Sequence, residues 1–422
     1  MSHLGGLSIS PQMHAILSKP GFIGSDDGGD RLRKMYSAGT ANLNMALLSP
    51  FARSVFTGDF DSVKKAVETG SAPDICGTET PYKWGYASFT ILGAQTVMNG
   101  PPGSCRFMET LEYLFSKGLP PDVPDITGFT ALDHSTMAPR PMDDFLRCLL
   151  KHGANVNHQD RYGAVALFGA MQHNHVSTVE VLMEHGADID IPDADGCTVR
   201  EFFVSCGPRV AATVAKCLRQ RTGEEALRAE KCCGACGKPP PSGGALKNCG
   251  KCRIARYCST ECQRSAWPTH KKTCTPFSAA NTATFKPVYT ENGFTIPFAE
   301  ATRGLAGYET DKTAFSNTRT RGAATPKHLD RQPKSIVIKV QVPYMPGSGP
   351  VVRSTGDLMV YTKKRDFVCR IRRADAPEDY ERISEVVRTQ GVGGAKAYFA
   401  AELESKDRLV VKVGEVLAPQ PW

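Results

Sequence analysis

The middle of this 422-residue chain repeats one pattern of hydrophobic and polar positions about every 33 residues. Residues 149–157 (LLKHGANVN) return as residues 182–190 (LMEHGADID), and a Gly-x-x-x-Leu motif at 128–132 returns at 163–167. In each copy a glycine follows the apolar positions, where it can adopt the left-handed conformation that ends a helix. We therefore predict that four to five helix pairs stack into an all-α solenoid over residues 47–220.

The earlier copies of this repeat are less regular. They lie near residues 51–74 and 111–122. The distance between equivalent glycines, about 33 residues elsewhere, increases to 51 between Gly77 and Gly128. Residues 99–103 (NGPPG) lie within that interval. We expect a projecting loop there, between the two helices of the second unit. Residues 1–46 form an N-terminal extension to the repeats.

The end of the chain has a different pattern, which predicts a small α+β domain over residues 334–422. Apolar and polar residues alternate over 335–342, as in a strand, and segments 358–361 and 367–371 flank a polar turn as in a hairpin. We also expect a helix after Pro377, a second helix over 395–403 and a closing strand over 409–413. Residues 277–333 have little periodicity and are predicted to be a linker.

The segment between the repeats and this linker carries eight soft metal ligands. In chain order they are Cys233, Cys236, Cys249, Cys252, Cys258, Cys262, His270 and Cys274. Each Cys-x2-Cys pair can offer two thiolates to one tetrahedral zinc ion, and the later pairs suit one turn of helix. The segment has few apolar residues, so zinc must supply most of its folding energy, on the order of 10 kcal/mol per site.

The motif around the later ligands resembles a MYND-type zinc finger over residues 231–276. The resemblance rests on residues 257–259 (YCS), 262–263 (CQ), 267–268 (WP) and 270–274 (HKKTC). It implies interleaved sites, with Cys233, Cys236, Cys258 and Cys262 on one ion and Cys249, Cys252, His270 and Cys274 on the other. The 33-residue period upstream likewise resembles ankyrin repeats.

Both implied sites have four protein ligands, which is typical of structural zinc, because a catalytic zinc keeps a position open for water. MYND fingers are known to dock proline-containing peptides, and the resemblance places Gln263 and Trp267 in the peptide groove. The two residues are four apart on a predicted helix and therefore share one face. The alternative is that Trp267 fills the small core of the finger.

These features together predict a non-catalytic adaptor with two protein-binding modules. A second hypothesis is nucleic-acid binding, because residues 231–274 hold nine basic residues and one acid. The basic residues are Lys231, Lys238, Lys247, Lys251, Arg253, Arg256, Arg264, Lys271 and Lys272. A third is an enzyme with an unrecognised C-terminal domain. In that domain the Gly-rich segment 391–394 precedes the expected helix, where its backbone N–H groups would be exposed to a phosphate. A plain turn is the favoured interpretation.

The sequence indicates neither a membrane span nor a secretory signal. No run of eighteen apolar residues occurs, and the first ten residues lack the pattern of a secretory signal. Seven of fifteen cysteines are assigned to metal, and the other eight are mostly scattered in apolar contexts. This usage indicates a reducing compartment, the cytosol or nucleus. His152 and His185 occupy equivalent places before the cap glycines, where we expect the imidazoles to bond helix-end carbonyls rather than a metal.

Overall fold

The computed structural model divides the chain into two units, Met1–Cys206 and Gly207–Trp422. It describes residues 4–97, 105–203, 206–223, 232–240, 246–289, 333–343 and 356–417. The loop expected at 99–103 lies outside the described residues, and its place in the chain is between two helices of one pair, as predicted.

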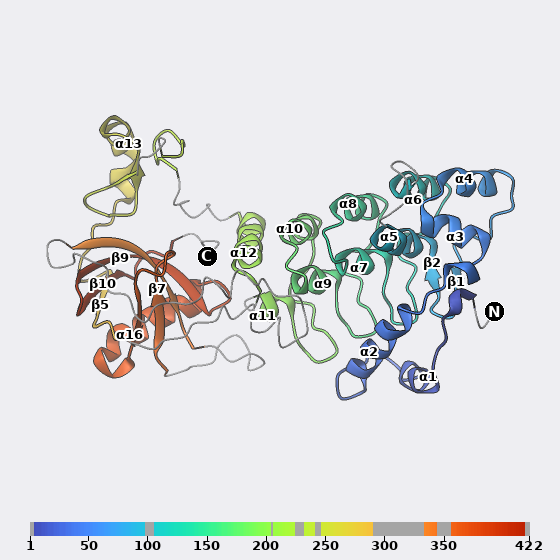
Figure 1. The fold of residues 1–422 in the computed structure, drawn as a ribbon. Coiled ribbons are helices and arrows are strands. Elements are labelled where there is room, and N and C mark those ends of the chain that lie inside the picture. The colour runs from blue at the N-terminus through green and yellow to red at the C-terminus, as the bar shows by residue number, and fades with distance from the viewer. Residues whose placement is uncertain are drawn as a thin grey trace. The chain divides into compact units, whose positions relative to one another are not determined.

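Consecutive helix pairs fill most of the first unit (Figure 1). They are α3 (Pro50–Thr57) with α4 (Phe60–Glu68), α5 (Tyr86–Thr96) with α6 (Phe107–Ser116), α7 (Ala131–Thr136) with α8 (Asp143–Lys151), and α9 (Ala166–Gln172) with α10 (Val176–Glu184), followed by α11 (Val199–Phe202). The first helices of successive pairs contact one another, so each pair buries its apolar face against the next. The predicted solenoid is confirmed. The compact unit that contains these pairs ends at Cys206, and the extent of the repeats, 47–220, stays a prediction.

The loops between the pairs share one turn. Oδ1 of Asp125, Asp160 and Asp193 accepts hydrogen bonds from the backbone N–H groups two and four residues later, at 2.7 to 3.1 Å. The intervening Gly128 and Gly163 have positive φ, and a Cβ there would lie 2.7 Å from the backbone of the next loop. Stacked tips of this kind explain the glycine spacing seen in the sequence.

The N-terminal extension folds onto these loop tips. It contains η1 (Leu4–Gly6), α1 (Pro11–Leu17), α2 (Gly29–Thr40) and η2 (Met45–Leu47). A two-strand ladder of β1 (Thr78–Glu79) and β2 (Trp84–Gly85) lies between α4 and α5. The Ser25 hydroxyl donates to Asp195 at 2.7 Å, and the Arg33 guanidinium lies 4.0 Å from the Tyr162 ring centre. Tyr36 is buried and donates its hydroxyl to Asp125. The extension is thus an integral part of the first unit.

The second unit begins with α12 (Pro208–Thr222) and ends in a six-stranded antiparallel sheet (Figure 1). The strand order is β5 (Thr282–Phe285), β10 (Arg408–Lys412), β9 (Lys396–Ser405), β6 (Lys334–Gln341), β7 (Leu358–Tyr361) and β8 (Val368–Ile371). Helix α16 (Pro377–Gln390), preceded by η4 (Arg373–Asp375), packs against β5 and β9. Backbone bonds of 2.9 Å in both directions join Val288, just after β5, to Arg370 on β8, so the two edges of the sheet meet.

Two expectations for this domain are wrong. Residues 395–403, expected to be a helix, lie in strand β9. Residues 277–333, expected to be a linker, contain strand β5 of the sheet. The phosphate cradle considered for residues 391–394 required a helix after the glycines, and a strand follows instead. The α+β class, the 358–371 hairpin, the helix after Pro377 and the closing strand are confirmed.

Candidate metal centre

The finger is built from two short strands and one helix. Strands β3 (Lys247–Asn248) and β4 (Arg256–Tyr257) pair, and α13 (Thr260–Thr273) follows directly. The Ser259 hydroxyl accepts a bond from the Cys262 N–H at 3.2 Å, which caps the N-terminus of the helix. The helix carries Cys262 and His270, and Cys274 is its C-cap. The core consists mainly of the cysteines themselves together with Ala255 and Tyr257.

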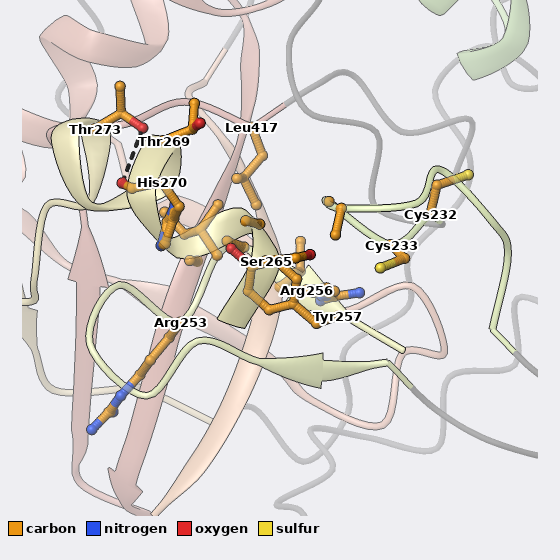
Figure 2. Close-up of a pocket in the computed structure, with 17 residues that line it drawn as sticks. Cys232, Cys233, Arg253, Arg256, Tyr257, Ser265, Thr269, His270, Thr273 and Leu417 are labelled. Carbon is orange, nitrogen blue, oxygen red and sulfur yellow. Dashed lines mark hydrogen bonds between the residues drawn. The ribbon is translucent and has the colours of Figure 1, made fainter. Parts of the chain in front are cut away.

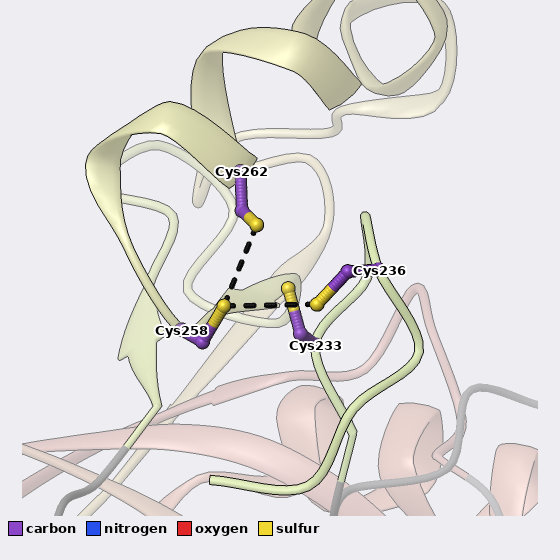
Figure 3. Close-up of side chains that lie close together, drawn as sticks. All are labelled: Cys233, Cys236, Cys258 and Cys262. Carbon is purple, nitrogen blue, oxygen red and sulfur yellow. Dashed lines mark hydrogen bonds between the residues drawn. The ribbon is translucent and has the colours of Figure 1, made fainter. Parts of the chain in front are cut away.

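Four cysteine sulfurs converge at the first site (Figure 3). Cys258 Sγ lies 3.4 Å from Cys262 Sγ and 3.7 Å from Cys236 Sγ, and the sulfurs of all four residues, Cys233 included, lie within 4.8 Å of one another. Two sulfurs at about 2.3 Å from one tetrahedral ion are about 3.8 Å apart. The donor set and its separations therefore fit zinc.

The second site combines three sulfurs with one imidazole. Cys249, Cys252, His270 and Cys274 bring their ligand atoms within 4.8 Å of one another. Cys252 Sγ lies 3.5 Å from His270 Nε2, which matches the spacing of about 3.5 Å between sulfur and nitrogen on one zinc ion. The interleaved pairing implied by the resemblance is the one that the structure brings together. The chain thus holds two structural zinc ions.

Both Cys-x2-Cys pairs lie in the same kind of tight turn. The N–H of Gly237 donates to the Cys233 carbonyl at 2.9 Å, and the N–H of Arg253 donates to the Cys249 carbonyl at 2.8 Å. Gly237 and Arg253 both have positive φ, of 68° and 57°. Glycine adopts this conformation without strain, whereas arginine does so at a cost of about 1 kcal/mol.

These turns also favour the thiolate form of the first cysteine in each pair, Cys233 and Cys249. Burial alone would raise the pKa of Cys233, but the backbone N–H groups of Cys236, Cys258 and Ala235 donate to its sulfur and lower the pKa to about 6. Burial opposes the same effect at Cys249, whose pKa is lowered by the N–H groups of Cys252 and Lys251. A thiolate is the species that binds zinc, so the turns prepare these two ligands for the metal.

Trp267 lies on the surface of the finger rather than in its core. Its exposed fraction is 36%, and it is not part of the buried cluster around Tyr257. The Lys251 ammonium lies 5.4 Å from the Trp267 ring centre, and the His270 ring meets Trp267 edge to face at 5.9 Å. Gln263, one turn earlier on α13, is half-buried. The interpretation of Trp267 as a core residue is therefore wrong.

A different face of α13 looks into a cleft of about 560 Å³ between the finger and the sheet (Figure 2). On the helix side it is lined by Ser265, Thr269 and Thr273, and on the side of the sheet by Leu417. Sequence reasoning missed this cleft. Its shape depends on how the finger packs against the C-terminal domain, and the sequence did not predict the fold of that domain in detail. Trp267 does not line it.

The finger packs against the outer face of the sheet. Ile254 and Phe277 contact a buried cluster of Tyr398, Ala400 and Leu417. At the edge of this contact Arg253 forms an ion pair with Glu402 of β9, and its guanidinium lies 5.3 Å from the Phe277 ring centre. Arg253 and Lys251 are thus engaged within the chain, which reduces the basic surface on which a nucleic-acid site would depend.

Sequence reasoning also missed a third cluster of metal-ligand residues. Glu112, Cys148 and His152 bring one ligand atom each within 4.8 Å of one another. His152 Nε2 contacts Glu112 Oε2 at 2.9 Å, so the expectation that His152 bonds a helix-end carbonyl is not met. It is met by His185, whose Nδ1 lies 2.8 Å from the Val181 carbonyl. The sequence offered only the Cys-x3-His spacing of Cys148 and His152 as a signal. Glu112 could not be added to it, because it comes from the preceding repeat.

Comparison with known proteins decides which modules these are. The MYND finger family matches residues 233–274, from the first ligand to the last, and the ankyrin repeat family matches residues 104–193 in three copies. The chain carries ankyrin repeats and a MYND finger. Modules of both kinds are protein-interaction domains, so protein binding is the general activity that the chain's two recognised parts share.

Individual relatives match over short stretches only. Dauer abnormal formation protein 25 of Caenorhabditis elegans is 52% identical over 42 residues, which is 10% of each chain. Human histone-lysine N-methyltransferase SMYD3 is 55% identical over 29 residues, 7% of each chain. A SET and MYND domain-containing protein of Dictyostelium discoideum is 43% identical over 44 residues, 10% of this chain and 8% of its own. The chain therefore spans about a tenth or less of these relatives.

Within the described residues, no helix combines the length and the apolar character that are needed to cross a membrane.

Proposed function

We propose that this protein is a non-catalytic adaptor, in which the MYND finger docks a proline-containing peptide on Gln263 and Trp267 while the ankyrin repeats hold a second protein. Two weak sites on one chain raise the overall affinity for a partner that engages both, because the second contact becomes intramolecular. Seven thiolate ligands need a reducing environment, so we place the protein in the cytosol or nucleus.

The exposure of Trp267 is the observation that carries this proposal. Trp267 lies outside the buried core of the finger and is 36% exposed, so part of its ring can contact a ligand. Proline-rich segments bind to aromatic-lined grooves as preformed extended helices. Gln263 lies on the same face of α13 and offers an amide that can bond a peptide backbone. The two zinc sites support the non-catalytic part, since four protein ligands leave no open position on either ion.

Replacing Trp267 by alanine tests the groove. We expect the full-length Trp267→Ala variant to lose about 2 kcal/mol of affinity for peptides captured from an array of varied proline spacing, the loss expected of a central aromatic anchor. Isothermal titration measures the affinity, and elemental analysis must still find the zinc content of the unaltered protein.

The control is Thr269→Tyr, which fills the cleft side of the same helix and should leave peptide affinity unchanged. If Thr269→Tyr abolishes binding and Trp267→Ala does not, the peptide occupies the cleft and the assignment to Gln263 and Trp267 is wrong. If neither variant changes the affinity, the finger does not dock the peptide.

A further inference from the structure

A cluster of three potential metal ligands lies between neighbouring ankyrin repeats, in a different unit from the finger. Glu112 belongs to α6, Cys148 lies one helical turn before His152, and His152 is the C-cap of α8. Residues four apart on a helix share a face, so the sulfur and the imidazole both meet the carboxylate of the preceding pair. We propose that Glu112, Cys148 and His152 form a third zinc site, which clamps the second helix pair to the third.

The donor set selects the class of metal. One thiol, one imidazole and one carboxylate are the three side-chain types that bind zinc, whereas magnesium and calcium bind through oxygen alone. Three protein ligands leave one coordination position for water. The side chains of Glu112 and His152 are 41% and 27% exposed while Cys148 is buried, so a hydrated ion can enter from the solvent side and reach the sulfur.

The geometry requires only a small adjustment to accept the ion. The His152 ring is stacked on Phe115, with ring centres 4.4 Å apart and planes 16° from parallel, which fixes the direction of Nε2. The Nε2 to Oε2 distance of 2.9 Å is that of a hydrogen bond, and a shared tetrahedral ion separates such atoms by about 3.4 Å. A rotation of the half-exposed Glu112 side chain is enough to increase the distance to that value. Lys151 contacts the other carboxylate oxygen, Oε1, at 3.1 Å and leaves Oε2 for the metal.

The cluster is not a general property of the repeat. Counting back from the cap glycine of the next unit, Val181 replaces Cys148 and Arg147 replaces Glu112, while His185 is kept. There the His185 ring turns to the carbonyl of its own helix, and Arg147 forms an ion pair with Glu184. Among the described residues of the solenoid, the sulfur, the carboxylate and the outward-turned imidazole therefore occur together at one interface.

Metal content of the full-length protein tests the site. At micromolar free zinc, equilibrium dialysis with elemental analysis should find three equivalents in the unaltered chain and in Cys76→Ser, which removes an exposed thiol of the same unit. It should find two in Cys148→Ser and in Glu112→Gln, which keeps an acceptor for His152. The finger sites supply the constant two equivalents, and peptide affinity at Trp267 is unaffected whichever result is obtained.

Cobalt gives an independent measure. Zinc binds such sites more tightly than cobalt, so cobalt added to protein whose finger is loaded with zinc should produce the visible absorption of thiolate-bound tetrahedral cobalt in the unaltered chain and none in Cys148→Ser. Two equivalents of zinc in the unaltered chain would overturn the proposal. A third equivalent that survives in both Cys148→Ser and Glu112→Gln would overturn it too.

Discussion

At the scale of single residues, the aspartates at the loop tips make the same turn but differ in burial. Asp160 and Asp193 make the same backbone bonds, but Asp160 is buried and Asp193 is only half-buried. Burial, reinforced by the nearby Asp133 carboxylate, raises the pKa of Asp160 from 3.8 to about 8. The folded chain therefore keeps a proton on Asp160 at neutral pH, whereas the unfolded chain does not.

This difference predicts the sign of a pH effect. Between pH 4 and pH 8 the folded state binds the extra proton, so Asp160 lowers the free energy of unfolding as pH rises, by at most about 1.4 kcal/mol per pH unit. Asp160→Asn keeps the acceptor oxygen and removes the titration. Urea unfolding at several pH values should show the variant gaining stability over the unaltered chain as pH rises through this range.

Asp190 is the control with the opposite sign. The hydrogen bond from Arg200 lowers the pKa of Asp190, so its stabilising contribution is present above its unfolded pKa and is lost as pH falls through the lower, folded value. Asp190→Asn should therefore differ from the unaltered chain by less in acid than at neutral pH. Curves for Asp160→Asn and the unaltered chain that run parallel from pH 4 to pH 8 would contradict the prediction for Asp160.

At the scale of elements, the Arg253 side chain joins the finger to strand β9. Its backbone occupies a position where glycine is unstrained, and its side chain forms the ion pair with Glu402, which is 13% exposed. We expect Arg253→Glu and Glu402→Arg each to lower the free energy of unfolding. The double exchange should restore part of this loss, with a coupling energy of about 1 kcal/mol, because the pair is partly buried.

Urea unfolding of the four proteins in this cycle measures the coupling. The matched exchange is Arg408 with Glu404, an exposed pair at 2.6 Å on the same sheet, for which we expect about 0.3 kcal/mol. Equal coupling in the two cycles would show that Arg253 and Glu402 behave as an ordinary surface pair.

The same contact explains why β9 was mistaken for a helix. Phe399 and Leu403 face the core of the sheet, whereas Tyr398 and Ala400 face Ile254 of the finger. A strand buried on both faces loses the alternation that marks a strand, and its alanines favour helix. Strand β6 was recognisable because its apolar and polar residues alternate, and β7 and β8 because they flank a polar turn. The metal ligands were recognisable because their spacing is local.

At the scale of the whole molecule, the zinc ions support more than the finger. Removing them with a strong chelator should unfold residues 233–274, because the finger has almost no other core. It should also expose Tyr398 and Ala400, which Ile254 and Phe277 cover. Hydrogen exchange should therefore increase in the finger and, to a smaller extent, in β9.

Helices α9 and α10 provide the internal reference for that experiment, since no proposed ligand lies on them. Their exchange should not change. Unchanged exchange in β9 after zinc removal would mean that the finger does not shield the sheet, and a loss of protection in α9 would mean that chelation disturbs the first unit as a whole.

The pairing of β5 with β10 has a consequence for biosynthesis. The strand made first in the sheet finds its partner only when the strand made last has left the ribosome, so hydrogen bonding along β5 must wait for the rest of the domain. A nascent or truncated chain that stops before Arg408 presents the unpaired edges of β5 and β9, the kind of surface through which incomplete sheets aggregate. The ankyrin block and the finger are complete long before that point, which makes the sheet the step at which a growing chain most needs a chaperone.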